Sequence, residues 1–291
     1  MTADVENQSY LLRRPDRVTT AVVFASPHSG RAYPEPFMRQ TILDEQEIRS
    51  SEDAFVDDLF ASAVAHGAPF LMAQAPRAFL DLNRGADELD GAVISGVRRV
   101  AHNPRIASGL GVIPRVVSNG RPIYNGKLSL QDAHDRISTV WRPYHDTLQM
   151  LLDEAHSTFG EAILIDCHSM PNEALENVGP PGAVRPDVVL GDRFGASAAS
   201  SVVEKVEAAF TAAGLKVARN MPFAGAYICQ NYGRPSRRCH AVQVEVNRSL
   251  YMDEKTVKPN ASFAAFKDLL NGVAGQLADI GRRDDARMAA E

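Results

Sequence analysis

Apolar runs that stop at polar or turn residues recur along the chain, and each predicts a buried strand. In residues 162–171 four apolar residues precede Asp-Cys-His-Ser, and residues 22–30 repeat the arrangement with a His after the apolar run. Residues 240–248 alternate apolar and polar positions, which predicts a strand with one polar row. The other expected strands are 70–73, 78–84, 188–190 and 215–218.

Helices are expected between these strands. In residues 51–66 the apolar positions fall on one helical face, with Ser51 as the N-cap and acidic residues in the first turn. A capping-box pattern at Ser129 begins a helix that reaches about residue 159, and Pro143 should kink or split it. The remaining expected helices are 36–49, 196–213 and 260–282. Alternating strands and helices predict an α/β fold whose mostly parallel sheet carries helices on both faces.

Composition narrows the possible partners. The 291 residues carry a net charge of −5 without a basic block, so nucleic acid is not an expected partner. No apolar run reaches the roughly 18–20 residues of a membrane span, and the N-terminus lacks a secretory signal. The three cysteines, Cys167, Cys229 and Cys239, have no CxxC spacing, which argues against a disulfide framework and favours a reducing compartment such as the cytoplasm.

Two histidines stand out because each follows an apolar strand and precedes a serine. His28 and His168 would therefore meet at the edge of the sheet where α/β proteins place ligands, and a metal held by two imidazoles and a carboxylate would fit. The other six histidines lack such context. No HExxH or HxxE motif supplies the acid, so Glu52 and Asp53 are both candidates for the third ligand. The alternative is that both only complement a helix dipole.

Three further polar residues end or line expected strands, and each has a structural alternative. Asp166 could orient an imidazole or simply bond to backbone. Glu245 could act as a general base beside a metal, or belong to a polar row that faces water. Arg84 could hold a substrate carboxylate or an oxyanion, or be a surface charge. The long segment 85–127, rich in Gly, Asn, Pro and Arg, is expected to be a functional loop region.

Six segments in order along the chain resemble the N-formylglutamate amidohydrolase family. Each is weak alone, but together they span residues 27 to 252. The matching segments are Pro27-His28-Ser29-Gly30, Glu52-Asp53-x-x-Val56-Asp57-x-Leu59, Phe79-Leu80-Asp81-Leu82-Asn83-Arg84, Ile165-Asp166-Cys167-His168-Ser169-Met170, Asn220-x-Pro222-Phe223-x-Gly225 and Gln243-x-Glu245-x-Asn247-Arg248-x-Leu250-Tyr251-Met252.

The resemblance implies one α/β domain over residues 1–291 with a mixed sheet, distantly similar to the zinc carboxypeptidase and aspartoacylase fold (phosphorylase/hydrolase-like). It implies one Zn²⁺, or another divalent cation, at the carboxyl edge of the sheet. The implied ligands are His28, His168 and Asp53, with Glu52 as the competing acid. Arg31 stands where carboxypeptidase-like enzymes have the Glu of HxxE, which leaves the acidic ligand open.

The resemblance also implies a catalytic Glu245 as general base and a catalytic Arg84 for the substrate or its oxyanion. The implied substrate-binding residues are Asn83, Arg84, Arg115, Asn220 and Gly225. Arg84, Arg115, Arg193 and Arg234 are all candidates for pairing with a substrate carboxylate.

The implied reaction is hydrolysis of N-formyl-L-glutamate, a small anionic substrate, to formate and L-glutamate late in histidine breakdown. The zinc would polarise the formyl carbonyl and supply hydroxide. Alternatives are the same metal site acting on another N-acyl amino acid or a peptide amide, and a metal-free binding protein of the same fold. A thiol enzyme using Cys167 is disfavoured, because adjacent strand residues such as Cys167 and His168 point to opposite faces. The sequence carries no signal of an oligomeric state.

Overall fold

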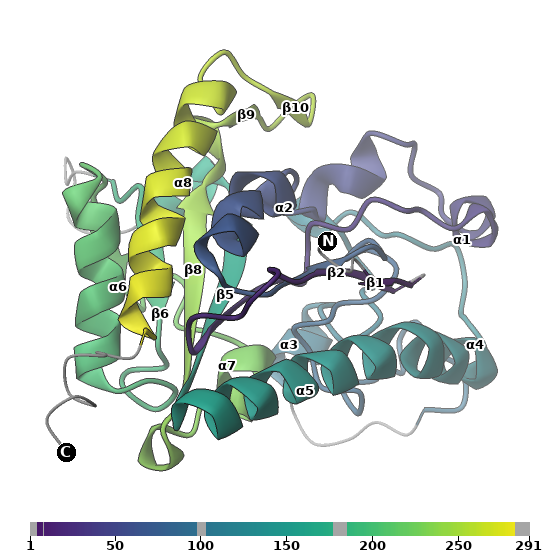
Figure 1. Cartoon of the computed structure of the whole chain (residues 1–291). Helices are drawn as coiled ribbons and strands as arrows, with labels where there is room; N and C mark the ends of the chain where they lie inside the picture. Colours follow the sequence, from purple (N-terminus) through teal and green to yellow (C-terminus); the bar gives the residue numbers. More distant parts are fainter. Residues whose placement is uncertain (1–4, 8, 98–102, 177–184, 283–291) are drawn as a thin grey trace, which may run out of the picture.

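An eight-stranded sheet forms the centre of the fold, with the strand order β1-β2-β4-β3-β5-β8-β6-β7. The structure is a computed structural model, and it describes residues 5–7, 9–97, 103–176 and 185–282. Figure 1 shows β5 and β8 in the middle of the molecule. The strands are β1 Val5–Glu6, β2 Tyr10–Arg13, β3 Val22–Ser26, β4 Phe70–Ala73, β5 Ala162–Met170, β6 Val188–Gly191, β7 Val217–Arg219 and β8 Cys239–Asn247. A small hairpin joins β9 Met252–Asp253 to β10 Lys258–Pro259.

The sheet is mixed and mostly parallel, as expected. Strands β4, β3, β5 and β8 pair in parallel, β7 runs parallel to β6, and β1, β2 and β6 supply the antiparallel pairings. The parallel register sets Asp166 opposite Gln243 and His168 opposite Glu245. Because side chains alternate along a strand, these four residues point to one face at neighbouring positions.

Helices cover both faces of the sheet (Figure 1). One core cluster packs the α5 side of the sheet, and a second packs β3, β5 and β8 against α2, α6 and α8. The α-helices are α1 Glu35–Gln40, α2 Val56–Leu59, α3 Pro104–Ala107, α4 Leu130–Arg136, α5 Arg142–Phe159, α6 Ser200–Ala212, α7 Tyr227–Tyr232 and α8 Phe263–Ile280. Short 3-10 turns lie at Glu47–Ser51, Ala61–His66, Ser118–Gly120, Asn172–Leu175, Pro235–Arg237 and Arg248–Leu250. None of the described helices is long and apolar enough to cross a membrane.

The predicted helix that begins at Ser129 runs without a break to Phe159, so Pro143 does not split it. Ser129 caps α4 through a capping box, and a π-helical turn at Ile137–Trp141 joins α4 to α5. Pro143 is the second residue of α5, immediately beyond this π-helical turn.

Three predictions of secondary structure are wrong. Residues 78–84 form turns rather than a strand: Leu80 and Leu82 anchor them in the core, while the intervening polar residues bond into the site. The expected helix 51–66 reduces to α2 and a 3-10 turn, because Phe55 takes a left-handed conformation. The expected helix 36–49 ends with α1, after which Thr41 is extended and pairs with Tyr124.

Candidate metal centre and cleft

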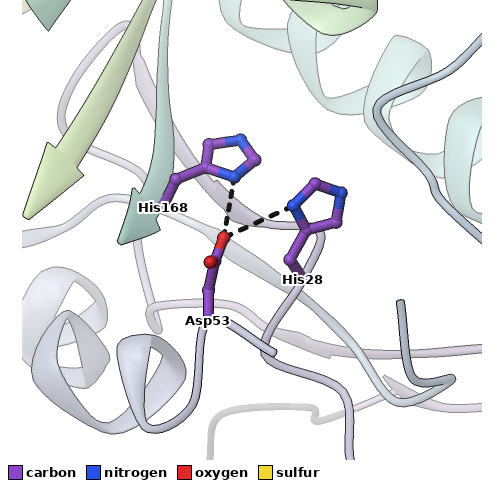
Figure 2. A group of neighbouring side chains, drawn as sticks. All are labelled: His28, Asp53 and His168. Carbon is purple, nitrogen blue, oxygen red and sulfur yellow. Dashed lines mark hydrogen bonds and ion pairs between the residues drawn. The ribbon is translucent and has the colours of Figure 1, made fainter. Parts of the chain in front are cut away.

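The two strand-end histidines meet, as the sequence predicted. His28 follows β3 and His168 lies on β5, and their ring centroids are 4.8 Å apart. Asp53 reaches them from the segment between the Glu47–Ser51 turn and α2, where its backbone N–H donates to the His28 carbonyl. Figure 2 shows the Asp53 carboxylate between the two rings.

All three side chains are buried and offer ligand atoms within 4.8 Å of one another. Asp53 Oδ2 lies 2.9 Å from His168 Nδ1 and 3.3 Å from His28 Nδ1 (Figure 2). Burial by itself would raise the pKa of the Asp53 carboxyl, but the hydrogen bond from His168 and the neighbouring His28 hold that pKa well below its usual range. Two imidazoles and one carboxylate are the ligand set typical of catalytic zinc sites.

Glu52 is turned away from this cluster. Its carboxylate accepts hydrogen bonds from Tyr33 and from the Arg49 guanidinium. Between the two acids that the sequence offered, the structure therefore brings Asp53 to the histidines.

A carboxylate lies at the outer nitrogen of each imidazole: Asp81 is hydrogen-bonded to His28, whereas Asp166 is close to His168 without a hydrogen bond. Asp81 Oδ1 lies 2.7 Å from His28 Nε2, and Asp166 Oδ2 lies 3.0 Å from His168 Nε2. A carboxylate on the far ring nitrogen fixes the orientation of a metal-binding imidazole and raises its basicity. The arrangement leaves both Nδ1 atoms turned inward, toward Asp53.

The buried Nδ1 atom of His28 has no hydrogen-bond partner among the described residues, although Asp53 is near. Buried polar atoms are nearly always paired, so an atom left unpaired at the centre of such a cluster indicates a missing partner. The other Asp53 oxygen, Oδ1, is already held by Arg248 Nη2 at 3.0 Å.

Glu245 lies beside the cluster on β8, opposite His168 in the register. It is buried and accepts a hydrogen bond of 2.8 Å from Gln243 Nε2. Burial raises the pKa of the Glu245 carboxyl to about 7. The polar row of β8 thus faces this site and not water.

The cluster opens into a cleft of about 550 Å³. Asn83, Arg84 and Gly225 all line it, as does Glu245. The Asn83 side chain is oriented by the Ile228 N–H, which donates to Oδ1 at 2.8 Å.

The other residues expected to bind substrate do not line this cleft. The Arg115 guanidinium pairs with Asp90, and Asn220 bonds to Asp192. Arg193 and Arg234 likewise lie outside the cleft lining and donate to backbone carbonyls.

Sequence reasoning gave no role to several cleft residues. Asp81 and Arg248 belong to matched segments, and their place two or three residues from Asn83 and Glu245 was the available signal. Arg77 and Arg105 lie outside every matched segment, so no signal marked them.

Together the sheet, the buried His/Asp/His cluster and the cleft define an α/β enzyme with a candidate metal centre. The sequence model of the N-formylglutamate amidohydrolase family matches residues 20–252, and the chain belongs to that family. It is therefore a hydrolase of the class that acts on amide bonds.

Individual relatives agree with this assignment. N-formylglutamate deformylase of Pseudomonas aeruginosa is 28% identical over 89% of this chain and 90% of its own length. The enzyme of the same name from Pseudomonas putida is 28% identical over 80% of this chain and 82% of its length. The crystal structure of N-formylglutamate amidohydrolase from Ralstonia eutropha JMP134 is similar with a TM-score of 0.88 and 33% identity, covering 94% of this chain and 98% of that one.

A more distant structure shares the fold. The gene product Atu2144 from Agrobacterium tumefaciens has a TM-score of 0.62 at 14% identity and covers 94% of this chain and 96% of that one.

Proposed function

We propose that the chain is a metal-dependent deformylase that hydrolyses N-formyl-L-glutamate to formate and L-glutamate. The observation that carries the proposal is the convergence of His28, Asp53 and His168 at the floor of a cleft. The names of the two Pseudomonas relatives and of the Ralstonia protein support the choice of substrate. In this role the enzyme would act late in histidine breakdown, in the cytoplasm.

A divalent cation fits the three side chains. The unpaired Nδ1 of His28 and the carboxylates behind both rings are what a metal-binding imidazole pair requires. Nitrogen and carboxylate donors favour Zn²⁺, which is the first candidate ion. An ion held here would polarise the formyl carbonyl and lower the pKa of a water molecule to about 7.

Glu245 is proposed as the general base. Gln243 occupies its Oε1, which leaves Oε2 to accept a proton from the attacking water and return it to the departing amine nitrogen. A pKa near 7 suits both halves of this transfer at neutral pH, because the carboxylate must take up the proton and then release it.

Asn83 and Arg84 are proposed to bind the substrate beside the reacting amide. Arg84 donates from Nε to the Leu110 carbonyl and from Nη1 to the Asn83 carbonyl, so Nη2 remains for a ligand. We propose that Arg84 Nη2 binds the α-carboxylate of the substrate, which lies next to the amide nitrogen in an N-acyl amino acid. The thiol alternative finds no support, because Cys167 packs in the core on the opposite face and burial raises its pKa well above the usual range.

The test is formate release by the purified chain, before and after removal of metal with a chelator. We expect hydrolysis of N-formyl-L-glutamate that disappears with the metal and returns with Zn²⁺, and no effect of Cys167→Ser. N-acetyl-L-glutamate and N-formyl-L-aspartate complete the panel. Turnover of another amide without N-formyl-L-glutamate would refute the substrate, and failure to bind any added divalent ion would refute the metal.

A further inference from the structure

Four arginines line the cleft, and they differ in what they already bind. Arg77 pairs with Asp81, and Arg248 is held by Asp53 and Ser169. Arg84 has committed two of its three nitrogens to backbone carbonyls. The guanidinium of Arg105, in α3, makes no hydrogen bond or ion pair with any described residue and is exposed.

Arg105 is nevertheless fixed at its backbone. The side chain of Asn103, the N-cap of α3, accepts a hydrogen bond of 2.9 Å from the Arg105 N–H. The Arg105 carbonyl accepts from the Leu110 N–H at 2.8 Å, and the Leu110 carbonyl accepts from Arg84 Nε at 2.9 Å. Leu110 therefore links the backbone of Arg105 to the side chain of Arg84.

These charges repel one another. Burial lowers the pKa of the Arg84 guanidinium, and the positive charges of Arg77 and Arg105 lower it further against the opposing effect of Asp81. Positive groups gathered in a partly buried cleft attract an anion that relieves the repulsion. Asp81 already pairs with His28 and Arg77, so it does not neutralise the charges of all the arginines at this end of the cleft.

The proposed substrate carries two carboxylates, and only the α-carboxylate has so far been assigned a partner, Arg84. Arg84 is buried next to Asn83, whose Nδ2 lies 3.3 Å from His168, so it serves the carboxylate nearer the amide. Arg105 stands farther out, where the cleft borders a second hollow lined by Glu88. Its position and its uncommitted donors suit the end of the substrate that is remote from the amide.

We propose that Arg105 binds the side-chain carboxylate of the substrate and so selects N-acyl derivatives of acidic amino acids over neutral ones. The inference rests on the proposed function and adds a specificity-determining residue to it. Arg105 takes no part in the proton transfers, so its contribution lies in binding.

The test compares N-formyl-L-glutamate with N-formyl-L-glutamine, which has nearly the same shape without the negative charge. A charge-assisted hydrogen bond corresponds to about 10- to 100-fold in affinity. We expect Arg105→Ala to lower kcat/KM for N-formyl-L-glutamate by this factor, mostly through KM, and to change the glutamine substrate less than about threefold. Arg105→Lys keeps the charge but loses the bidentate guanidinium, so its kcat/KM for N-formyl-L-glutamate should lie between those of the wild type and Arg105→Ala.

The matched control is Arg237→Ala. Arg237 is another exposed arginine in a short turn, it lies outside the cleft lining, and its removal should leave both substrates unaffected. Thermal unfolding of each variant checks that the fold is intact. An equal loss on both substrates, or no loss on N-formyl-L-glutamate, would overturn the role of Arg105 while the deformylase activity stands. A wild-type chain inactive on both compounds would refute the proposed function itself, and this inference with it.

Discussion

At the scale of single residues, the adjacent strands β5 and β8 each bring a buried carboxyl group to the candidate metal centre. Asp166 lies on β5 behind His168, whereas Glu245 lies on β8 with a pKa raised to about 7 by burial. The register that sets His168 opposite Glu245 places the proposed base beside the candidate ligand. Strand β5 therefore contributes the candidate ligand His168, and β8 contributes the proposed base Glu245.

Glu245→Gln should abolish proton transfer while leaving the shape of the cleft intact. We expect kcat to fall by about 10²–10⁴-fold with the metal content unchanged, since Glu245 is not among the three candidate ligands. Steady-state kinetics together with metal analysis measures both quantities. Turnover close to that of the wild type would remove Glu245 from the mechanism.

Asp81→Asn should weaken metal binding without removing a ligand. Asp81 orients His28 through Nε2, and the loss of such an outer carboxylate typically costs 10–100-fold in metal affinity. Competition with a chromogenic chelator measures this affinity directly. Asp90→Asn is the control, because Asp90 is also a buried partner of an arginine but pairs with Arg115, away from both rings. Equal affinities of the Asp81 and Asp90 variants would contradict the role of Asp81.

At the scale of elements, the π-helical turn between α4 and α5 supports the cleft. Trp141, at its end, donates from Nε1 to the Arg84 carbonyl at 2.9 Å. One turn further on, His145 Nε2 donates to the Leu82 carbonyl at 2.9 Å. Two ring N–H groups four residues apart thus hold the backbone on both sides of Asn83. π-Helical turns are frequent at functional sites.

Trp141→Phe should loosen Arg84 while keeping most of the aromatic packing. The loss of one hydrogen bond corresponds to about 1 kcal/mol, or roughly fivefold in affinity. We expect this loss in KM for N-formyl-L-glutamate, with kcat nearly constant, because Glu245 and the three candidate ligands are not touched. A fall in kcat alone would show that the turn acts on the chemistry and not on substrate binding.

The elements that sequence patterns predicted well are those in which buried and polar positions repeat regularly along a strand. Both histidines could be predicted as site residues because they follow the apolar runs of β3 and β5. Glu245 could be predicted from the alternation of β8. Residues 78–84 were predicted to be a strand because alternation alone does not reveal whether a neighbouring strand is present. The choice between Glu52 and Asp53 depended on the extended backbone at Glu52 and on the bond from the Asp53 N–H to the His28 carbonyl, which no helical periodicity shows. Arg105 comes from a short helix in an irregular segment, where no periodicity exists to read.

At the scale of the whole molecule, His145 couples folding to pH. It is buried, with Nδ1 accepting from the Tyr232 hydroxyl and Nε2 donating to a carbonyl, so the folded chain holds the neutral ring. Burial lowers its pKa from 6.5 to about 4. Between these values the unfolded chain binds more protons than the folded one, so the free energy of unfolding falls as the pH falls.

Acidification from pH 6.5 to 4 should therefore remove up to about 3 kcal/mol of stability through His145. Urea unfolding of the wild type and of His145→Gln at several pH values measures it. The variant should lose less stability over this window, because the contributions of all other groups cancel in the comparison. Identical pH dependence of the two chains would contradict the assignment.

Trp141 is the single tryptophan of the chain, and its indole N–H donates to the carbonyl of Arg84, which is proposed to bind the substrate. All indole fluorescence of the protein accordingly originates beside the cleft. Binding of a ligand at Arg84 should shift or quench that emission, and Trp141→Phe is the control that has no indole fluorescence. The chain thus contains its own optical probe, with which occupancy could be titrated without label or turnover.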